Sequence, residues 1–162
     1  MKTAFKGHQE VVRELIVQQG ANVNVEGKDD WTPDMSAAFK GHLEVVRELI
    51  VQHGANVNVE DKDGWTPVKI AAFKCHLEVV REMIVQHGAN VNVEGKYFWI
   101  PLMKTAFKGH QEVVRELIVQ HGANVNVEGK DGWTPVMSAA FEGYLEAVRQ
   151  LLVHVAEVER AN

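Results

Sequence analysis

Histidine is the residue type in this sequence that most directly suggests metal chemistry. The chain has eight histidines in 162 residues, and most of them recur every 34 residues. One row comprises His8, His42, His76 and His110, and a second comprises His53, His87 and His121. Zinc ligands lie about 2.0–2.1 Å from one centre, whereas equivalent positions on packed helices are roughly 10 Å apart. We therefore predict structural or solvated histidines and no metal site.

Nucleophilic and phosphate-binding chemistry finds no support in the sequence. The chain has no phosphate loop, no GxSxG, no HExxH and no CxxC pair. Its one cysteine, Cys75, occupies a position that is glycine in the other repeats, and no base adjoins it in sequence. An active nucleophile needs such a base or a lowered pKa. We predict a protein that is not an enzyme, with no catalytic residue and no cofactor.

Aromatic and basic residues form the rows that best fit a binding function. Their members are Trp31, Trp65, Trp99 and Trp133; Phe39, Phe73, Phe107 and Phe141; and Lys40, Lys74 and Lys108, which follow the first three phenylalanines. Aromatic and basic side chains on a rigid exposed surface are typical of interface hot spots. Alternatively, each Trp packs over the next hairpin and each Phe against its neighbour, which would stabilise the stack. Both interpretations hold if one ring face stays exposed.

A tandem repeat of 34 residues positions these rows. We predict one domain over residues 1–162, with a partial repeat at 1–26 and full repeats at 27–60, 61–94, 95–128 and 129–162. Such a repeat cannot bury its own apolar face and must stack on its copies. Residues 1–29 match residues 103–131 except at Gln19, where the later copy has His121. This near-identity indicates a recent duplication or a constructed array.

Each repeat contains signals for two helices. In the third repeat, Thr66 is a good N-cap and Pro67 suits the first helical position, so a short helix should follow over residues 68–74. Cys75 marks a turn position that favours positive φ. Apolar spacing predicts a second helix over about 76–86, and Gly88 should end it in the left-handed conformation. Residues 89–94 should form a hairpin or extended loop.

The segments Thr66–Ala72, His76–Val80 and Gly88–Asn92 resemble the ankyrin repeat, and the resemblance covers essentially the whole chain. A tetratricopeptide array has the same period but lacks these Thr-Pro, Ala-Ala and Gly-Ala-Asn-Val-Asn landmarks. The resemblance implies an all-α helix-loop-helix solenoid of five helix pairs with short β-hairpin loops. It also implies that a protein partner binds the concave helix and hairpin face, where the aromatic and lysine rows would lie.

The chain departs from the family pattern in its second helix and in its first. The common period is about 33, and the extra residue falls near Arg81 and Glu82. We expect a longer last turn or a local π-type bulge to absorb it. The family's usual His after Thr-Pro-Leu is replaced, so the hydrogen bond that it commonly provides between repeats is not expected. The replacements are Met1, Met35, Lys69, Met103 and Met137.

The fourth repeat and both ends of the array also differ. Phe98 replaces a turn glycine and Ile100 replaces the N-cap Thr, which costs about 1 kcal/mol for the cap alone. Asp34 is expected in a hydrated environment at the N-terminal end. The last repeat lacks its terminating glycine, so its final helix should extend to about Arg160. The stripe on that helix comprises Val148, Leu152, Val155 and Glu159.

The composition argues against nucleic acid and membranes as partners. The net charge of −5 argues against nucleic acid, which requires a basic face. No apolar run approaches the 18 or so residues that span a bilayer, and the N-terminus lacks the apolar segment of a secretory signal. Pairs at Glu44/Arg47, Glu78/Arg81 and Glu112/Arg115 suggest a solvated outer face rather than an acidic binding strip.

The predicted function is therefore non-catalytic protein–protein interaction in the cytoplasm, by an intracellular soluble protein. We expect no membrane or nucleic-acid partner, and either a monomer or weak end-to-end self-association. The alternative is a structural or designed scaffold array, or an excised fragment of a longer repeat protein, with no dedicated partner.

Overall fold

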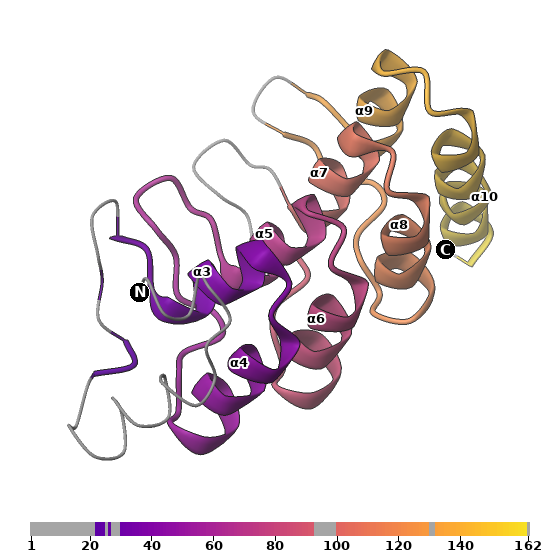
Figure 1. The fold of residues 1–162 in the computed structure, drawn as a ribbon. Helices are drawn as coiled ribbons and strands as arrows, with labels where there is room; N and C mark the ends of the chain where they lie inside the picture. Colours follow the sequence, from indigo (N-terminus) through magenta and orange to yellow (C-terminus); the bar gives the residue numbers. More distant parts are fainter. Residues whose placement is uncertain (1–21, 25, 27–29, 93–99, 130–131, 162) are drawn as a thin grey trace. The chain divides into compact units, whose positions relative to one another are not determined.

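The computed structural model describes residues 22–24, 26, 30–92, 100–129 and 132–161. The chain divides into two compact units, Met1–Asn90 and Val91–Asn162. In both units the described residues form successive helix pairs joined by loops (Figure 1).

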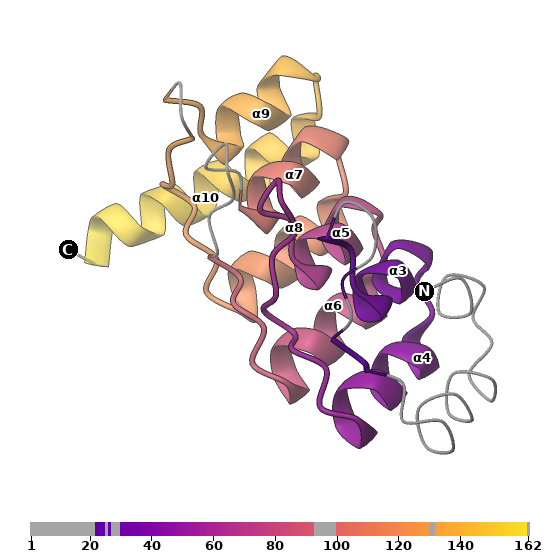
Figure 2. The same cartoon turned by 90° about the vertical axis from the view of Figure 1, so that its left-hand side faces the viewer.

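The first unit contains the helix pairs of the second and third repeats. Its helices are α3 (Pro33–Lys40), α4 (Leu43–Arg47) with the π-helix η2 (Glu48–Gln52), α5 (Pro67–Phe73), and α6 (Leu77–Arg81) with the π-helix η3 (Glu82–Gln86). The first helices of the two repeats, α3 and α5, lie side by side, and so do the second helices, α4 and α6 (Figure 2). This is the stacking that the repeat predicts.

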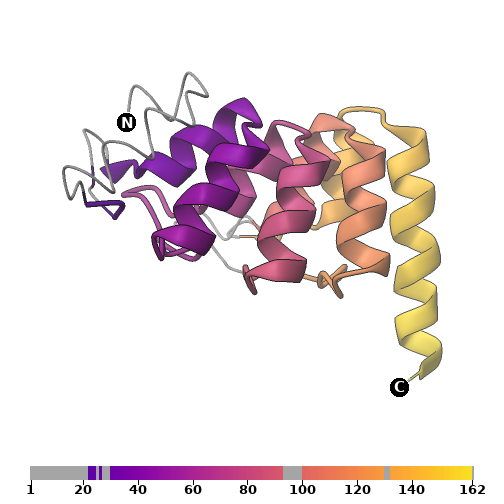
Figure 3. The same ribbon diagram turned by 60° about the horizontal axis from the view of Figure 1, so that its bottom comes forward.

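The second unit contains the helix pairs of the fourth and fifth repeats. Its helices are α7 (Pro101–Lys108), α8 (Gln111–Val119), α9 (Pro135–Phe141) and α10 (Leu145–Ala161). Helix α7 packs on α9 and α8 on α10, and Figure 3 shows α10 in yellow continuing past the end of α8. The predicted extension of the last helix is therefore confirmed.

The predicted apolar stripe of that last helix is wrong at one position. Leu152 is 51% exposed, and the side chains that are buried are Ala147 and Leu151. The helix therefore turns a neighbouring stripe toward α8 and α9. Within the described residues, no helix is both long and apolar enough to cross a membrane.

The helix starts follow the predicted capping chemistry. The Thr66 hydroxyl accepts a hydrogen bond from the Lys69 backbone N–H at 3.4 Å, and Thr134 caps α9 in the same way at 3.2 Å. Ile100 provides no side-chain cap to α7. Its side chain is fully buried instead, which offsets the lost cap by apolar burial. Phe98 lies outside the described residues.

The turn after each first helix has the predicted left-handed backbone. Gly41 has a φ of 73° and Cys75, which replaces the glycine, has a φ of 61°. Gly88, which follows the second helix, is also left-handed, with a φ of 67°. These angles confirm why glycine recurs at both positions.

The core of the first unit is built from buried residues of both helices of each repeat. Ala71 and Ala72 on α5 are fully buried, which lets neighbouring backbones approach closely. On α6 and η3, Val79, Val80 and Met83 are buried. The predicted apolar face of the second helix is therefore confirmed at its centre.

The extra residue of the 34-residue period is absorbed as predicted in two repeats. The second helix changes from α to π geometry at Glu48 and at Glu82, for five residues each. In the fourth repeat, α8 stays α-helical to Val119 and a turn follows. The π-type bulge is thus confirmed in the second and third repeats and is replaced by a turn in the fourth.

The environment predicted for Asp34 is wrong. Asp34 is only 1% exposed, and burial raises its pKa to about 6. One carboxylate oxygen accepts a hydrogen bond from the Thr32 hydroxyl, and the other has no hydrogen-bond partner. The Thr32 side chain consequently does not cap α3.

The loops between repeats are joined by an asparagine ladder. The backbone N–H of Asn90 donates to the side-chain oxygen of Asn58 at 2.9 Å, and Asn56 and Asn124 donate in the same way to Asn24 and Asn92. No strand is assigned within the described loops. The β-hairpin form of these loops therefore stays a prediction.

A candidate binding surface of paired aromatic rings

Each described tryptophan packs against the phenylalanine of its own repeat. The ring centroids are 5.6 Å apart for Trp31 and Phe39, and 5.4 Å apart for Trp65 and Phe73, both in T-shaped geometry. The pair exists because the Trp directly precedes the N-cap Thr and the Phe lies at the end of the helix. Edge-to-face contacts of this kind stabilise by about 0.5–1.5 kcal/mol beyond burial.

The fifth repeat repeats this arrangement with more exposure. Trp133 and Phe141 are 5.4 Å apart, again T-shaped, and Phe141 is 70% exposed. The rings of the second and third repeats are half-buried. Packing and exposure therefore coexist, and each of these ring pairs joins the Trp and the Phe of one repeat. Trp99 lies outside the described residues, and Phe107 is half-buried.

Lysine ammonium groups lie over the phenylalanine rings. The Lys74 Nζ is 4.2 Å from the ring centroid of Phe39 in the preceding repeat and 5.8 Å from that of Phe73. Lys40 and Lys108 each lie 5.7 Å from the Phe before them. These distances fall within the range of cation–π attraction. The structure thus brings the predicted lysine and phenylalanine rows together.

A pocket of about 440 Å³ opens between the two ring pairs of the first unit. Its lining comprises Trp31, Phe39, Asp61, Lys62, Asp63, Trp65, Ile70 and Phe73. The pocket lies between two repeats, because its walls come from α3 and the segment before it, and from α5 and the turn that precedes it. Two of the predicted tryptophans and two of the predicted phenylalanines therefore line one pocket.

Asp61 holds the turn of this pocket in place. One of its carboxylate oxygens accepts hydrogen bonds from the backbone N–H of Asp63 at 2.9 Å and of Trp65 at 2.8 Å. The other accepts a hydrogen bond from the Trp31 indole N–H of the preceding repeat at 3.1 Å. Asp61 was not among the site residues predicted from the sequence. The available signal was an aspartate at a position that is otherwise Gly27, Gly95 and Gly129.

Lys69 is the second residue of this region that was not predicted as a site residue. Its side chain is 2% exposed, and its ammonium donates a hydrogen bond to the Gly64 carbonyl at 2.7 Å. The other repeats have methionine at this position. Here the lysine stabilises the turn through its hydrogen bond to the Gly64 carbonyl. The bond stays within one repeat, unlike the family's histidine bond.

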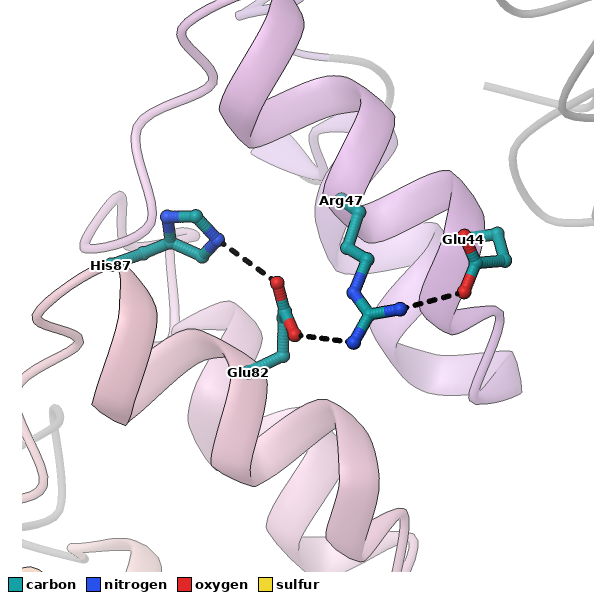
Figure 4. A network of polar contacts seen from close by, with 4 residues as sticks. All are labelled: Glu44, Arg47, Glu82 and His87. Atoms are coloured by element: carbon teal, nitrogen blue, oxygen red, sulfur yellow. Dashed lines mark hydrogen bonds and ion pairs between the residues drawn. The ribbon is translucent and has the colours of Figure 1, made fainter.

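The second helices of the first unit carry an ion-pair network (Figure 4). Arg47 contacts Glu44 of its own helix and Glu82 of the next repeat, both at 2.9 Å. The hydrogen bond from Arg47 lowers the pKa of Glu82 below its ordinary value. The predicted pairs Glu44/Arg47 and Glu78/Arg81 are confirmed.

The outer face otherwise follows its predicted solvated character. In the described part of the chain, no ion pair joins Glu112 and Arg115 on α8. The side chains of Glu44, Arg47, Glu78 and Arg81 are 45–69% exposed. Exposed pairs of this kind contribute little stability.

The described histidines occupy structural positions. His76 Nε2 donates to the Phe39 carbonyl at 3.1 Å, which ties one repeat to the next. His53, His87 and His121 each pair with a glutamate five residues earlier, at 3.3–3.4 Å. Among the described residues, no three His, Cys, Asp or Glu side chains gather in a metal-binding arrangement.

Comparison with known families identifies the repeat. A family model described as ankyrin repeats in three copies matches residues 1–95 and again residues 93–162. A search of curated proteins finds no match. The two matched segments together span the whole chain.

Proposed function

Because the chain belongs to the ankyrin repeat family, we propose that it is a non-catalytic module that binds a protein partner through its ring-bearing side. Ankyrin repeats generally mediate protein–protein interaction, and the family is typically not enzymatic. The proposed contact residues are the tryptophan, phenylalanine and lysine rows defined above, on the face that the resemblance identifies as concave.

The exposure of rigid ring pairs carries this proposal. Trp31, Phe39, Trp65 and Phe73 are each fixed by a T-shaped contact and yet remain half-exposed. Rigid aromatic groups lose little conformational entropy on binding, and for this reason they dominate many interfaces. The outer helices offer exposed Glu–Arg pairs instead, which give less binding energy per contact.

The alternative function is a structural scaffold with no dedicated partner. The close match of residues 1–29 to 103–131 favours it, because duplication preserves packing without selecting a binding surface. In that case the ring pairs serve only the stability of the stack. The cytoplasmic location, and a monomer or a weak end-to-end association, stay predictions under either function.

Paired variants distinguish the two functions. Replacing Trp65 and Phe73 together with alanine should abolish capture of the partner from extract of the native host, while the helical circular dichroism remains. The matched control replaces Glu78 and Arg81, on the outer side of the same repeat, with alanine and should keep capture.

The stability of the same variants provides the second readout. Because the rings are only half-buried, we expect their removal to cost about 1–3 kcal/mol, less than the 3–5 kcal/mol of fully buried aromatic residues. If the ring variant captures the same proteins as the wild type and differs only in its unfolding temperature, the rings serve packing and the binding proposal fails.

A further inference from the structure

The pocket between the two ring pairs has the size and lining of a ligand site. Its volume of about 440 Å³ falls within the 300–1,000 Å³ that is usual for small-ligand sites. The ring pairs form its aromatic walls, and Ile70, which is 3% exposed, adds buried aliphatic surface. Such a lining favours an apolar or aromatic occupant.

The pocket is held in shape before anything binds. Three hydrogen bonds converge on Asp61, from the Trp31 indole and from the backbone of Asp63 and Trp65. Lys69 holds the Gly64 carbonyl of the same turn. Because the turn and the first ring are fixed, a partner does not have to order them, and preorganisation of this kind increases affinity.

The charges around the pocket favour an anion on one side. Asp61 turns its carboxylate toward the three donors that it binds and is itself buried. Lys62 and Asp63 follow in the turn and carry opposite charges. Lys40 and Lys74 both lie over the Phe39 ring, at 5.7 and 4.2 Å. Phe39 lines the pocket, whereas Lys40 and Lys74 do not, so the two ammonium groups border the pocket through the Phe39 ring.

We propose that this pocket receives one large aromatic or aliphatic side chain of an extended partner segment, with a carboxylate of that segment beside it. The side chain enters between the ring pairs, and the carboxylate lies near Lys40 and Lys74. This inference rests on the proposed function, since it specifies the chemistry of the protein partner at that surface. A cationic side chain held in an aromatic cage is the competing occupant, because aromatic faces also attract ammonium groups.

Four small probes separate these occupants. The full chain, labelled with ¹⁵N, is titrated with N-acetyltryptophan, its neutral amide, tryptamine, and N-acetylglycine, while the indole N–H signals are followed by NMR. Titration to about 20 mM suffices, because ligands of this size typically bind in the sub-millimolar to millimolar range. The Trp31 and Trp65 signals should shift saturably with N-acetyltryptophan.

The order of affinities tests the chemistry. N-acetyltryptophan should bind about threefold more tightly than its amide, as one screened surface ion pair allows. Tryptamine should bind more weakly than the amide, and N-acetylglycine should not shift the two signals. About 0.5 M NaCl should remove the difference between N-acetyltryptophan and its amide.

Two controls lie within the same chain. Trp133 forms the same ring pair, but Glu142 stands where Lys40 and Lys74 follow the other phenylalanines, so its signal should not move. Replacing Lys40 and Lys74 with glutamine should make N-acetyltryptophan and its amide bind equally.

Three results would overturn the proposal. Tightest binding by tryptamine would identify a cation site, equal shifts at Trp133 would show nonspecific ring contact, and no shift at Trp31 and Trp65 would exclude the pocket. Each of these leaves the capture experiment untouched, so failure of the pocket and failure of the binding function are distinguishable.

Discussion

Asp34 places an ionisable group at a buried position where the later repeats have an apolar residue. Val68, Leu102 and Val136 occupy the same position in later repeats. In Asp34 a carboxyl group is buried with one oxygen unpaired, and burial raises its pKa to about 6 from an ordinary 3.8. A buried carboxylate without a full set of donors is costly when ionised.

Replacing Asp34 with valine should therefore stabilise the chain most at neutral pH. The folded state binds the proton more tightly than the unfolded state, so the contribution of Asp34 to stability is complete below about pH 4. It is lost as the pH rises through about 6. The shift corresponds to a difference on the order of 3 kcal/mol between the two limits.

The measurement is the free energy of unfolding of the wild type and of Asp34→Val between pH 4 and pH 7. The advantage of the variant should widen as the pH rises, because valine has no proton to lose. An advantage that is constant across this range would show that the carboxyl group of Asp34 does not titrate upon unfolding. Asp63→Asn, at an exposed position of the turn, provides the control.

At the residue scale, conformation was easier to predict than environment. The positive φ of Cys75 and the cap formed by Thr66 follow from local backbone chemistry, and both were predictable. The burial of Asp34 and the three hydrogen bonds to Asp61 depend on groups that the fold brings together. Residue type alone suggests solvent for an aspartate, so these two environments were missed.

At the scale of elements, the second helices show how a 34-residue repeat adapts a 33-residue architecture. The π turns of η2 and η3 begin at Glu48 and Glu82, where the extra residue was predicted. In each case the glutamate reaches a histidine five residues later. A π turn brings residues i and i+5 together. Glu116 and His121 pair in the same way in the fourth repeat, where α8 has no π turn, so the Glu–His pair forms with either helix ending.

The turn after a first helix packs closely against the next repeat at two glycines. A Cβ at Gly41 would lie 2.6 Å from the His76 ring of the next repeat, and one at Gly109 would lie 2.6 Å from the Tyr144 ring. His76 also donates to the Phe39 carbonyl. Glycine is therefore required for space as well as for its backbone angle.

Gly41→Ala should consequently cost more than an equivalent change at Gly54. Both glycines have a φ near +70°, but nothing lies within 4 Å of a Cβ at Gly54. The left-handed strain of about 1 kcal/mol is common to both variants. The contact with His76 should add about 1–3 kcal/mol for overpacking, measured as the difference in free energy of unfolding.

A double variant tests the origin of that difference. Replacing His76 with alanine in the Gly41→Ala background should recover part of the loss, because the two side chains no longer overlap. Equal stability of Gly41→Ala and Gly54→Ala would contradict the contact.

At this scale the helices were predictable and the contacts between them were not. Capping residues and apolar spacing are local signals, so a short stretch of sequence is enough to predict each helix. The asparagine ladder joins residues 32 apart, as from Asn58 to Asn90. Its signal, two asparagines per repeat, is visible in sequence, but the pairing depends on the rise and rotation between repeats.

At the scale of the whole molecule, the repeat places the same residue types at equivalent positions of successive repeats, which gives the aromatic and lysine rows. The family was predictable from sequence because its landmarks recur in each repeat, and the family model matches residues 1–95 and 93–162. The candidate pocket was predictable only in part. Four of its lining residues belong to the predicted aromatic rows, while Asp61, Lys62, Asp63 and Ile70 come from a turn and a helix that the stack brings beside them.

The central claim is that the ring-bearing side of the repeats binds the partner. Hydrogen–deuterium exchange, measured on the chain alone and in complex with a captured partner, tests it most directly. We expect slower exchange in the complex over residues 31–40 and 61–74, and no change over the outer helices at 77–86. Protection confined to residues 77–86, with the ring-bearing segments unchanged, would contradict the claim.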